Sequence, residues 1–250
     1  MSWCTIPAMS DKAPKTDVIT LSDVPPVSFI TSGVKEIDEL TGGYPKGRIT
    51  QVYGLSAVGK TSLMLKCLAA ISKDHKVLYI DVENALNVER AAELGADLLK
   101  IDYSNLSVLE DVAELVRNSI TSYQMIVVDS IAMLTPRAEH QGETGEAHVG
   151  LKPRLIGQWL REMTEALNKS GCALILINQM RRSMEMYGDP YVLPGGMQLK
   201  FSSSLMLKLS TTKADQVVKD KAVIGHWVHV KVDKTKVSKP HLTSKFKLTY

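Results

Sequence analysis

The 250-residue sequence contains few cysteines and no long hydrophobic segment. Its three cysteines, Cys4, Cys67 and Cys172, have neither the short spacing of metal ligands nor the pairing expected of a disulfide-rich secreted domain. No run approaches the roughly 20 apolar residues of a membrane-spanning helix. The first residues also lack the basic segment and apolar run of a secretory signal. We therefore expect reduced thiols, no membrane partner and a cytoplasmic location.

The first 28 residues lack helical periodicity. Prolines stand at positions 7, 14, 25 and 26 among mainly polar residues. This composition predicts an extended arm or a disordered leader, which could serve as an oligomerisation segment. Residues 29–250 are long enough for one α/β domain with a substantial core, and the chain's apolar content of 44% is ordinary for such a domain.

Positive charge is unevenly distributed along the chain. The net charge is only +3, but the last 70 residues carry 13 lysines and arginines against five acids. A basic C-terminal part suggests a polyanionic partner such as nucleic acid. A solvated basic edge of a sheet is the alternative explanation.

One glycine-rich motif, G-x-x-x-x-G-K-[ST], dominates the sequence. It consists of Gly54, Leu55, Ser56, Ala57, Val58, Gly59, Lys60 and Thr61, with Ser62 next along the chain. Backbone N–H groups of such a P-loop surround nucleotide phosphates, while Lys60 neutralises their charge and Thr61 ligates Mg²⁺. A glycine-rich turn with an incidental lysine is the alternative, but a strand-like run precedes the motif and a helical pattern follows it.

Residues 125–129 form a β-branched apolar run that ends in Asp129. Behind a P-loop, this pattern is typical of a Walker B strand, whose aspartate holds Mg²⁺ through its hydration shell. The sequence thus predicts that the protein binds ATP together with Mg²⁺, and that Thr61 and Asp129 hold the metal ion.

Continuous apolar runs at 49–53, 76–80, 125–129 and 173–179 predict strands buried on both faces. Helical patterns at 89–94, 108–118 and 151–168 lie between them. We predict an α/β fold with a central, mainly parallel sheet flanked by helices. Strands at 204–209, 227–232 and 246–250, with no helix between them, would follow, and the C-terminal end of the chain would form antiparallel strands. Ligands of such sheets bind at the carboxyl edge.

Residues 180–196 are polar and rich in glycine and proline, which predicts a long loop at that edge. The loop begins with Arg181 and Arg182 and ends with Gly195 and Gly196.

Several strings, in this order, resemble those of the bacterial RecA recombinase family. They are residues 79–86, 127–139, 142–143, 148–151, 177–179 and 195–196, the last followed by 199–201. The resemblance runs from about residue 30 to the C-terminus. It implies a RecA-like P-loop core that binds ATP and Mg²⁺.

The resemblance also implies roles for individual residues. Glu83 matches the catalytic carboxylate that activates water, and Gln179 matches the residue that senses the γ-phosphate. Residues 139–146 and 180–196 match two DNA-binding loops, and Arg154 and Arg161 match helix positions that face DNA. Four residues match the filament interface, where the two later lysines reach the neighbouring subunit's nucleotide: Lys200, Phe201, Lys234 and Lys236.

The chain departs from the family pattern in three places. The family's N-terminal helix has no counterpart in residues 1–28, and its C-terminal domain has none after Tyr250. Asn87 stands where an acid usually reads the adenine amino group, and Arg90 stands where an aromatic ring usually stacks on the base. We therefore expect relaxed base selectivity.

The resemblance implies a strand-exchange ATPase that forms a helical homo-oligomeric filament on single-stranded DNA and engages double-stranded DNA. A single-strand-binding or loader protein is a further expected partner. Two alternatives remain open: an ATP-binding mediator or regulatory paralogue that does not exchange strands, and a ring-forming helicase motor.

Overall fold

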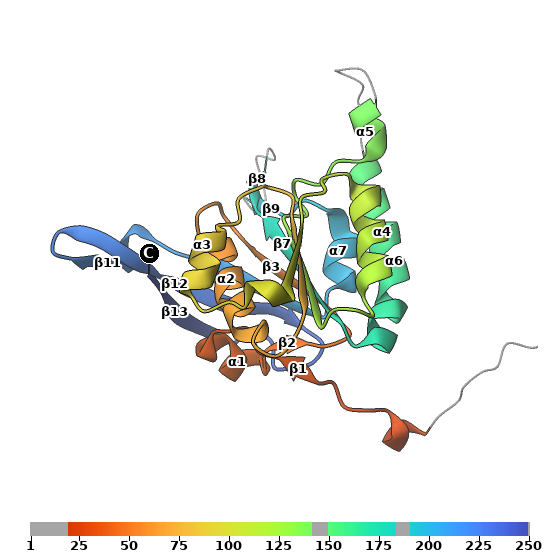
Figure 1. The fold of residues 1–250 in the computed structure, drawn as a ribbon, viewed down its shortest axis with the longest axis horizontal. Coiled ribbons are helices and arrows are strands. Elements are labelled where there is room, and N and C mark those ends of the chain that lie inside the picture. The colour runs from red at the N-terminus through yellow and green to blue at the C-terminus, as the bar shows by residue number, and fades with distance from the viewer. Residues whose placement is uncertain (1–19, 142–149, 184–190, 250) are drawn as a thin grey trace, which may run out of the picture.

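The computed structural model describes residues 20–141, 150–183 and 191–249. Within these residues, one sheet of nine strands forms the centre of the domain (Figure 1). Its parallel strands, in spatial order, are β10 (Leu205–Ser210), β3 (Ile49–Gly54), β7 (Ala173–Gln179), β6 (Met125–Asp129), β4 (Val77–Asp81) and β5 (Ile101–Ser104). The antiparallel strand β12 (Ala222–Thr235) pairs with β10, β11 (Gln216–Lys219) and β13 (Thr243–Thr249).

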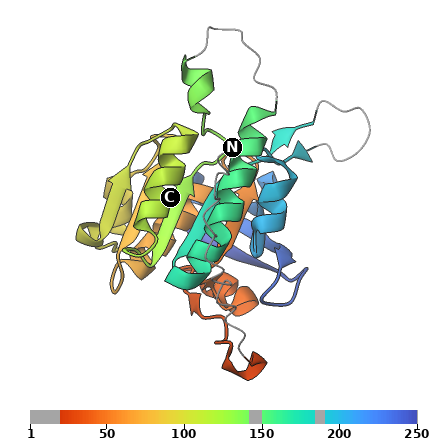
Figure 2. The same ribbon diagram turned by 90° about the vertical axis from the view of Figure 1, so that its right-hand side faces the viewer.

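Helices cover both faces of the sheet (Figures 1 and 2). One face packs against α1 (Lys35–Thr41), α2 (Lys60–Ile71) and α3 (Val88–Glu93). The other packs against α4 (Leu109–Ser119), α6 (Leu151–Ser170) and α7 (Gly196–Ser202). Successive strand residues alternate between the faces, so Val127 joins the first core and Ile126 joins the second. Central strands therefore read as unbroken apolar runs.

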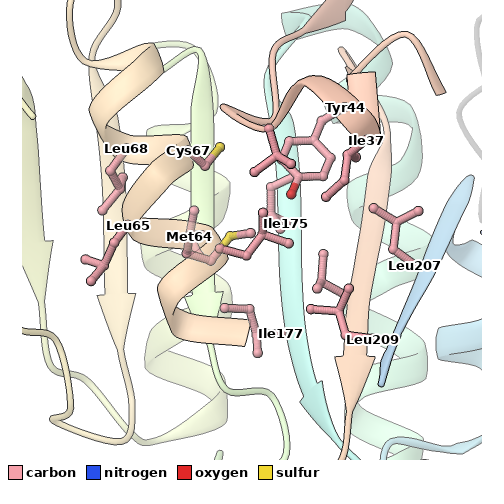
Figure 3. Close-up of a cluster of buried hydrophobic side chains, with 14 of the residues drawn as sticks. Ile37, Tyr44, Met64, Leu65, Cys67, Leu68, Ile175, Ile177, Leu207 and Leu209 are labelled. Carbon is pink, nitrogen blue, oxygen red and sulfur yellow. The ribbon is translucent and has the colours of Figure 1, made fainter. Parts of the chain in front are cut away.

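The P-loop helix is anchored on the first of these cores. Figure 3 shows Met64 of α2 beside Ile175 and Ile177 of β7, and all three side chains are fully buried. Burying an aliphatic side chain of this size contributes about 1.5–3 kcal/mol. The start of α2 is thus held firmly against the sheet.

The predicted fold class is confirmed, and the predicted helices at 89–94, 108–118 and 151–168 are present with shifts of one or two residues. One expectation is wrong: a short 3-10 helix (Lys213–Asp215) lies between β10 and β11, stabilised by a capping box between Thr212 and Asp215. The segment 180–196 is also not entirely loop. It contains the paired strands β8 (Arg181–Arg182) and β9 (Tyr191–Val192), whose two-residue lengths are too short to show a pattern.

The N-terminal part of the domain forms a separate small sheet from β1 (Phe29–Ile30) and β2 (Tyr44–Pro45). Before it, residues 21–23 form a short, exposed 3-10 helix. The rest of the predicted arm lies outside the described residues, so the division at residue 28 stays a prediction. None of the described helices is both long and apolar enough to cross a membrane. A short helix, α5 (Arg137–Gln141), follows β6.

Candidate nucleotide-binding and catalytic site

The P-loop connects the end of β3 to the start of α2, at the carboxyl edge of the parallel strands. Gly59 precedes α2 with a left-handed φ of 90°. A Cβ atom on Gly59 would lie 2.3 Å from Cδ1 of Leu248 in β13. Only glycine therefore fits where the C-terminal strand packs against the loop.

Lys60 is almost fully buried at the first position of α2. Its Nζ donates to the carbonyl oxygens of Leu55 at 2.8 Å and Gly54 at 3.4 Å. Burial lowers the pKa of this ammonium, although the charges of Asp129 and Glu83 act in the opposite direction. A buried cation held only by carbonyl dipoles would gain strongly from a phosphate oxygen.

Asp129 ends β6 with its carboxylate buried beside the P-loop. Thr61 Oγ1 and Tyr79 Oη both donate to its Oδ2, at 2.9 and 2.8 Å. Burial raises the pKa of Asp129, and these two hydrogen bonds partly offset the rise. The sequence did not single out Tyr79, which lies on the P-loop face of β4.

The donor set of Thr61 and Asp129 suits Mg²⁺. A hydroxyl and a carboxylate are hard oxygen ligands, and Mg²⁺ usually takes one or two of these and fills its shell with water and phosphate oxygens. No group of three acidic, histidine or cysteine side chains among the described residues could hold a metal by itself. The residues therefore fit a nucleotide-bound ion rather than a protein-only metal site.

Glu83 lies just beyond β4, within reach of the ends of β6 and β7. Gln179 donates from Nε2 to Oε1 of Glu83 at 2.7 Å, and the Ser130 hydroxyl donates to the same oxygen. The two predicted catalytic residues are thus in direct contact. Sequence reasoning missed Ser130, although its position directly after Asp129 places it at the same sheet edge.

A hollow of about 420 Å³ opens beside the start of α2. Asn87 caps α3, accepting the Arg90 backbone N–H on Oδ1 at 2.7 Å, and Arg90 donates from Nη2 to the carbonyl of Thr249 at 2.9 Å. The hollow is lined by Thr61, Ser62, Leu65, Lys66, Ala85, Asn87, Arg90, Leu94, Leu248 and Thr249. The structure thus brings both predicted base-binding residues beside the P-loop helix.

The predicted DNA-binding residues gather around the starts of α6 and α7. Gly196 meets Pro153 of α6 so closely that a Cβ would lie 3.1 Å from the proline Cβ. Arg154 and Arg161 are exposed on α6, and Arg181 is exposed in β8. Gly195 precedes α7 with a left-handed φ of 103°. Arg182 also belongs to β8, but its side chain, residues 142–149 and residues 184–190 lie outside the described part.

Lys152 is a basic residue of this region that the sequence did not single out. Its Nζ donates to the carbonyl of Ala132 at 2.6 Å. Burial and the nearby charge of Arg181 lower the pKa of Lys152, and the charge of Glu139 acts in the opposite direction. The structure therefore places Lys152 between the roots of the two predicted DNA-binding loops.

The four predicted interface residues lie together, away from their own P-loop. Lys234 donates to the carbonyls of Lys200, Phe201 and Ser203, and Lys236 donates to that of Phe201. Both lysines thus cap the C-terminus of α7, where a cation is favoured. Lys234 pairs with Met206 near the start of β10, whereas the P-loop follows the opposite end of the neighbouring strand.

Comparison with known proteins identifies the family. Residues 5–250 match the model of the RecA N-terminal domain. The chain belongs to this family. The RecA resemblance seen in the sequence is therefore confirmed.

Among RecA relatives, the protein RecA of Staphylococcus carnosus is 39% identical over 230 residues, covering 90% of this chain and 64% of that protein. Protein RecA of Clostridium acetobutylicum is 38% identical over 234 residues, covering 91% of this chain and 66% of that protein. The chain thus spans slightly less than two thirds of the length of these RecA proteins. In fold, it resembles the crystal structure of the RadB recombinase, with a TM-score of 0.66 at 20% identity. That match covers 88% of this chain and 96% of the other.

Proposed function

We propose that this protein is a DNA-dependent ATPase that forms filaments on single-stranded DNA and pairs and exchanges strands with homologous double-stranded DNA. ATP and Mg²⁺ are its proposed ligands, and further copies of the chain are its proposed partners. The contact between Gln179 and Glu83 carries this proposal. Gln179 ends β7, and β8 with Arg181 follows after one residue. The proposed path from nucleotide to DNA is therefore only a few residues long.

In the proposed reaction, Lys60 exchanges its loop carbonyls for phosphate oxygens and stabilises the charge that develops on the transferred phosphoryl group. Glu83 orients the attacking water and accepts its proton. Bound Mg²⁺ would neutralise phosphate charge beside Thr61 and Asp129. Gln179, drawn toward the γ-phosphate, would release Oε1 of Glu83 for this role and shift the start of the following segment.

The proposed DNA site combines the exposed arginines of α6 with the loop roots. Phosphate contacts from such side chains supply most of the affinity for single strands, and the affinity falls steeply with salt. Membership of the RecA family and the RecA relatives named above support this assignment.

Two measurements test the function. ATP hydrolysis should rise when single-stranded DNA is added, and electron micrographs with a slowly hydrolysed ATP analogue and that DNA should show helical filaments. Rings would indicate a motor. Particles that stay monomeric, with no stimulation of hydrolysis by DNA, would indicate a regulatory paralogue. Either result would overturn the proposal.

A further inference from the structure

The hollow beside α2 presents hydrogen-bond donors to a ligand. Asn87, Arg90 and Lys66 supply an amide, a guanidinium and an ammonium. None of the described residues that line the hollow carries a carboxylate. Its apolar walls are Leu65, Leu94 and Leu248, which suits the faces of a planar ring.

The cap of α3 determines which end of the Asn87 side chain remains for a ligand. The Arg90 backbone N–H lies 2.7 Å from Oδ1 of Asn87. Only the carbonyl oxygen of an amide can accept this bond, so the orientation of the amide follows from chemistry. The Nδ2 group, a donor of two hydrogen bonds, is the end not used by the cap.

Arg90 is held in place by two further bonds. Its Nη1 pairs with Glu93 at 2.8 Å and its Nη2 donates to the Thr249 carbonyl at 2.9 Å. The first bond lies within α3, and the second joins α3 to the end of β13, on the opposite wall of the hollow. A guanidinium fixed in this way offers a flat surface for stacking as well as positive charge.

We propose that this hollow holds a purine base through the acceptor atoms of the base, and that guanine and hypoxanthine nucleotides therefore bind at least as tightly as adenine nucleotides. The proposal rests on nucleotide binding at the P-loop and specifies the base. Guanine and hypoxanthine carry an oxygen at position 6, which accepts a hydrogen bond from the Asn87 amide. Adenine carries an amino donor there and would face another donor.

Calorimetric titration of the full chain with ATP, GTP and ITP in the presence of Mg²⁺ tests the proposal. ITP carries the oxygen at position 6 without the 2-amino group of guanine, so it isolates the contribution of that oxygen. The wild type should bind GTP and ITP at least as tightly as ATP. Asn87→Asp keeps the helix cap, since Asp and Asn cap equally well. It replaces the amide donor with an acceptor, and should therefore lower the affinities for GTP and ITP by about tenfold or more relative to the affinity for ATP.

Val88→Asp is the matched control. It adds the same charge one residue away, at an exposed position that does not line the hollow. It should change the three affinities equally, because it acts only through its charge. If Val88→Asp shifts the ratio of GTP affinity to ATP affinity as strongly as Asn87→Asp does, recognition of the base by the Asn87 amide is refuted.

The outcomes separate this inference from the proposed function. If the wild type binds ATP more tightly than either GTP or ITP, the base assignment fails while nucleotide binding stands. If none of the three binds, or if Lys60→Ala leaves all three affinities unchanged, the P-loop function fails and the base assignment fails with it.

Discussion

Gln179 and Glu83 share a hydrogen bond of 2.7 Å that passes over the end of β6, because β6 lies between the strands that lead to these two residues. The Ser130 hydroxyl donates to the same Glu83 oxygen. Two donors thus occupy one oxygen of the carboxylate that would accept a proton from water. In this arrangement the carboxylate is restrained, and its use depends on a change at the ends of two neighbouring strands.

The first prediction separates binding of ATP from its hydrolysis. Glu83→Gln should keep ATP affinity within a few fold of the wild type and lower kcat by about 10²-fold or more, because a neutral amide cannot accept the proton. Lys60→Ala should lower the affinity itself, since it removes the buried ammonium beside the phosphates. Titration with a slowly hydrolysed ATP analogue and steady-state assays measure the two effects.

Glu165→Gln is the control for that pair, because Glu165 is exposed on α6 and pairs only with the exposed Lys169 among the described residues. It should change neither quantity. Equal loss of ATP affinity in Glu83→Gln and Lys60→Ala would contradict the division of roles.

The second prediction concerns DNA. Replacing Arg181 and Arg182 with alanine should reduce the slope of log affinity against log salt by about 0.7 for each phosphate that is no longer neutralised on single-stranded DNA. A control variant with Lys35 and Lys169 replaced also removes two exposed cations, and should leave the slope unchanged. Fluorescence anisotropy across a salt series provides the measurement. An unchanged slope in the arginine variant would place the DNA elsewhere.

The third prediction is that Lys234 and Lys236 complete the ATP site of a neighbouring subunit. Their own P-loop lies at the opposite end of the strands, so a variant with alanine at both positions should bind nucleotide nearly normally. It should lose DNA-stimulated hydrolysis and long filaments. Mixing it with Lys60→Ala, which is inactive by itself, should restore partial hydrolysis, because some interfaces pair an intact P-loop with intact lysines.

Both lysines also cap α7, so the double variant should lose about 0.3–1 kcal/mol of stability per lysine. Thermal unfolding checks that it remains folded. Lys231→Ala serves as the control on the same strand, since Lys231 is paired with Asp233 within its own chain. If co-assembled mixtures stay inactive, the lysines act within their own subunit.

The fourth prediction links Asp129 to pH. Because burial raises its pKa above the ordinary value of 3.8, ionised Asp129 favours the unfolded state. The stability present below pH 3.8 is lost as the pH rises through the folded pKa. An asparagine at this position would not titrate, and it would keep an oxygen for Thr61 and Tyr79. At pH 8, Asp129→Asn should therefore have a Tm a few degrees above that of the wild type, by about 2–4 °C for each kcal/mol of unfolding free energy gained. Near pH 4 the two proteins should have the same Tm. A lower Tm at pH 8 would contradict this account.

Most of the sheet and its ligand edge could be predicted because central strands buried on both faces give unbroken apolar runs, as at residues 125–129 and 173–179. The edge strand β5 was missed, since Asp102 and Tyr103 are exposed and break the run. The helix α7 was missed because it is only seven residues long and begins at the second of two consecutive glycines.

Within the candidate site, motif residues were predictable and their partners were not. Lys60, Thr61 and Asp129 belong to motifs with fixed spacing. Tyr79 is 50 residues away from Asp129 in the sequence, and only the pairing of β4 with β6 brings the two together. Contacts of this kind depend on strand order, which local patterns do not specify.

The strand β12 gives the proposed filament a fixed length scale. Near one end, His226 lies behind Gly59 of the P-loop, and near the other, Lys234 donates to a carbonyl at the C-terminus of α7. Eight residue steps of extended backbone separate them, roughly 27 Å. Because a hydrogen-bonded strand hardly stretches, β12 would fix the distance between consecutive ATP sites in the filament. Movement of one P-loop upon phosphate release would then displace the lysines at the next site. Hydrolysis at one ATP site would in this way be coupled to hydrolysis at its neighbour in the filament.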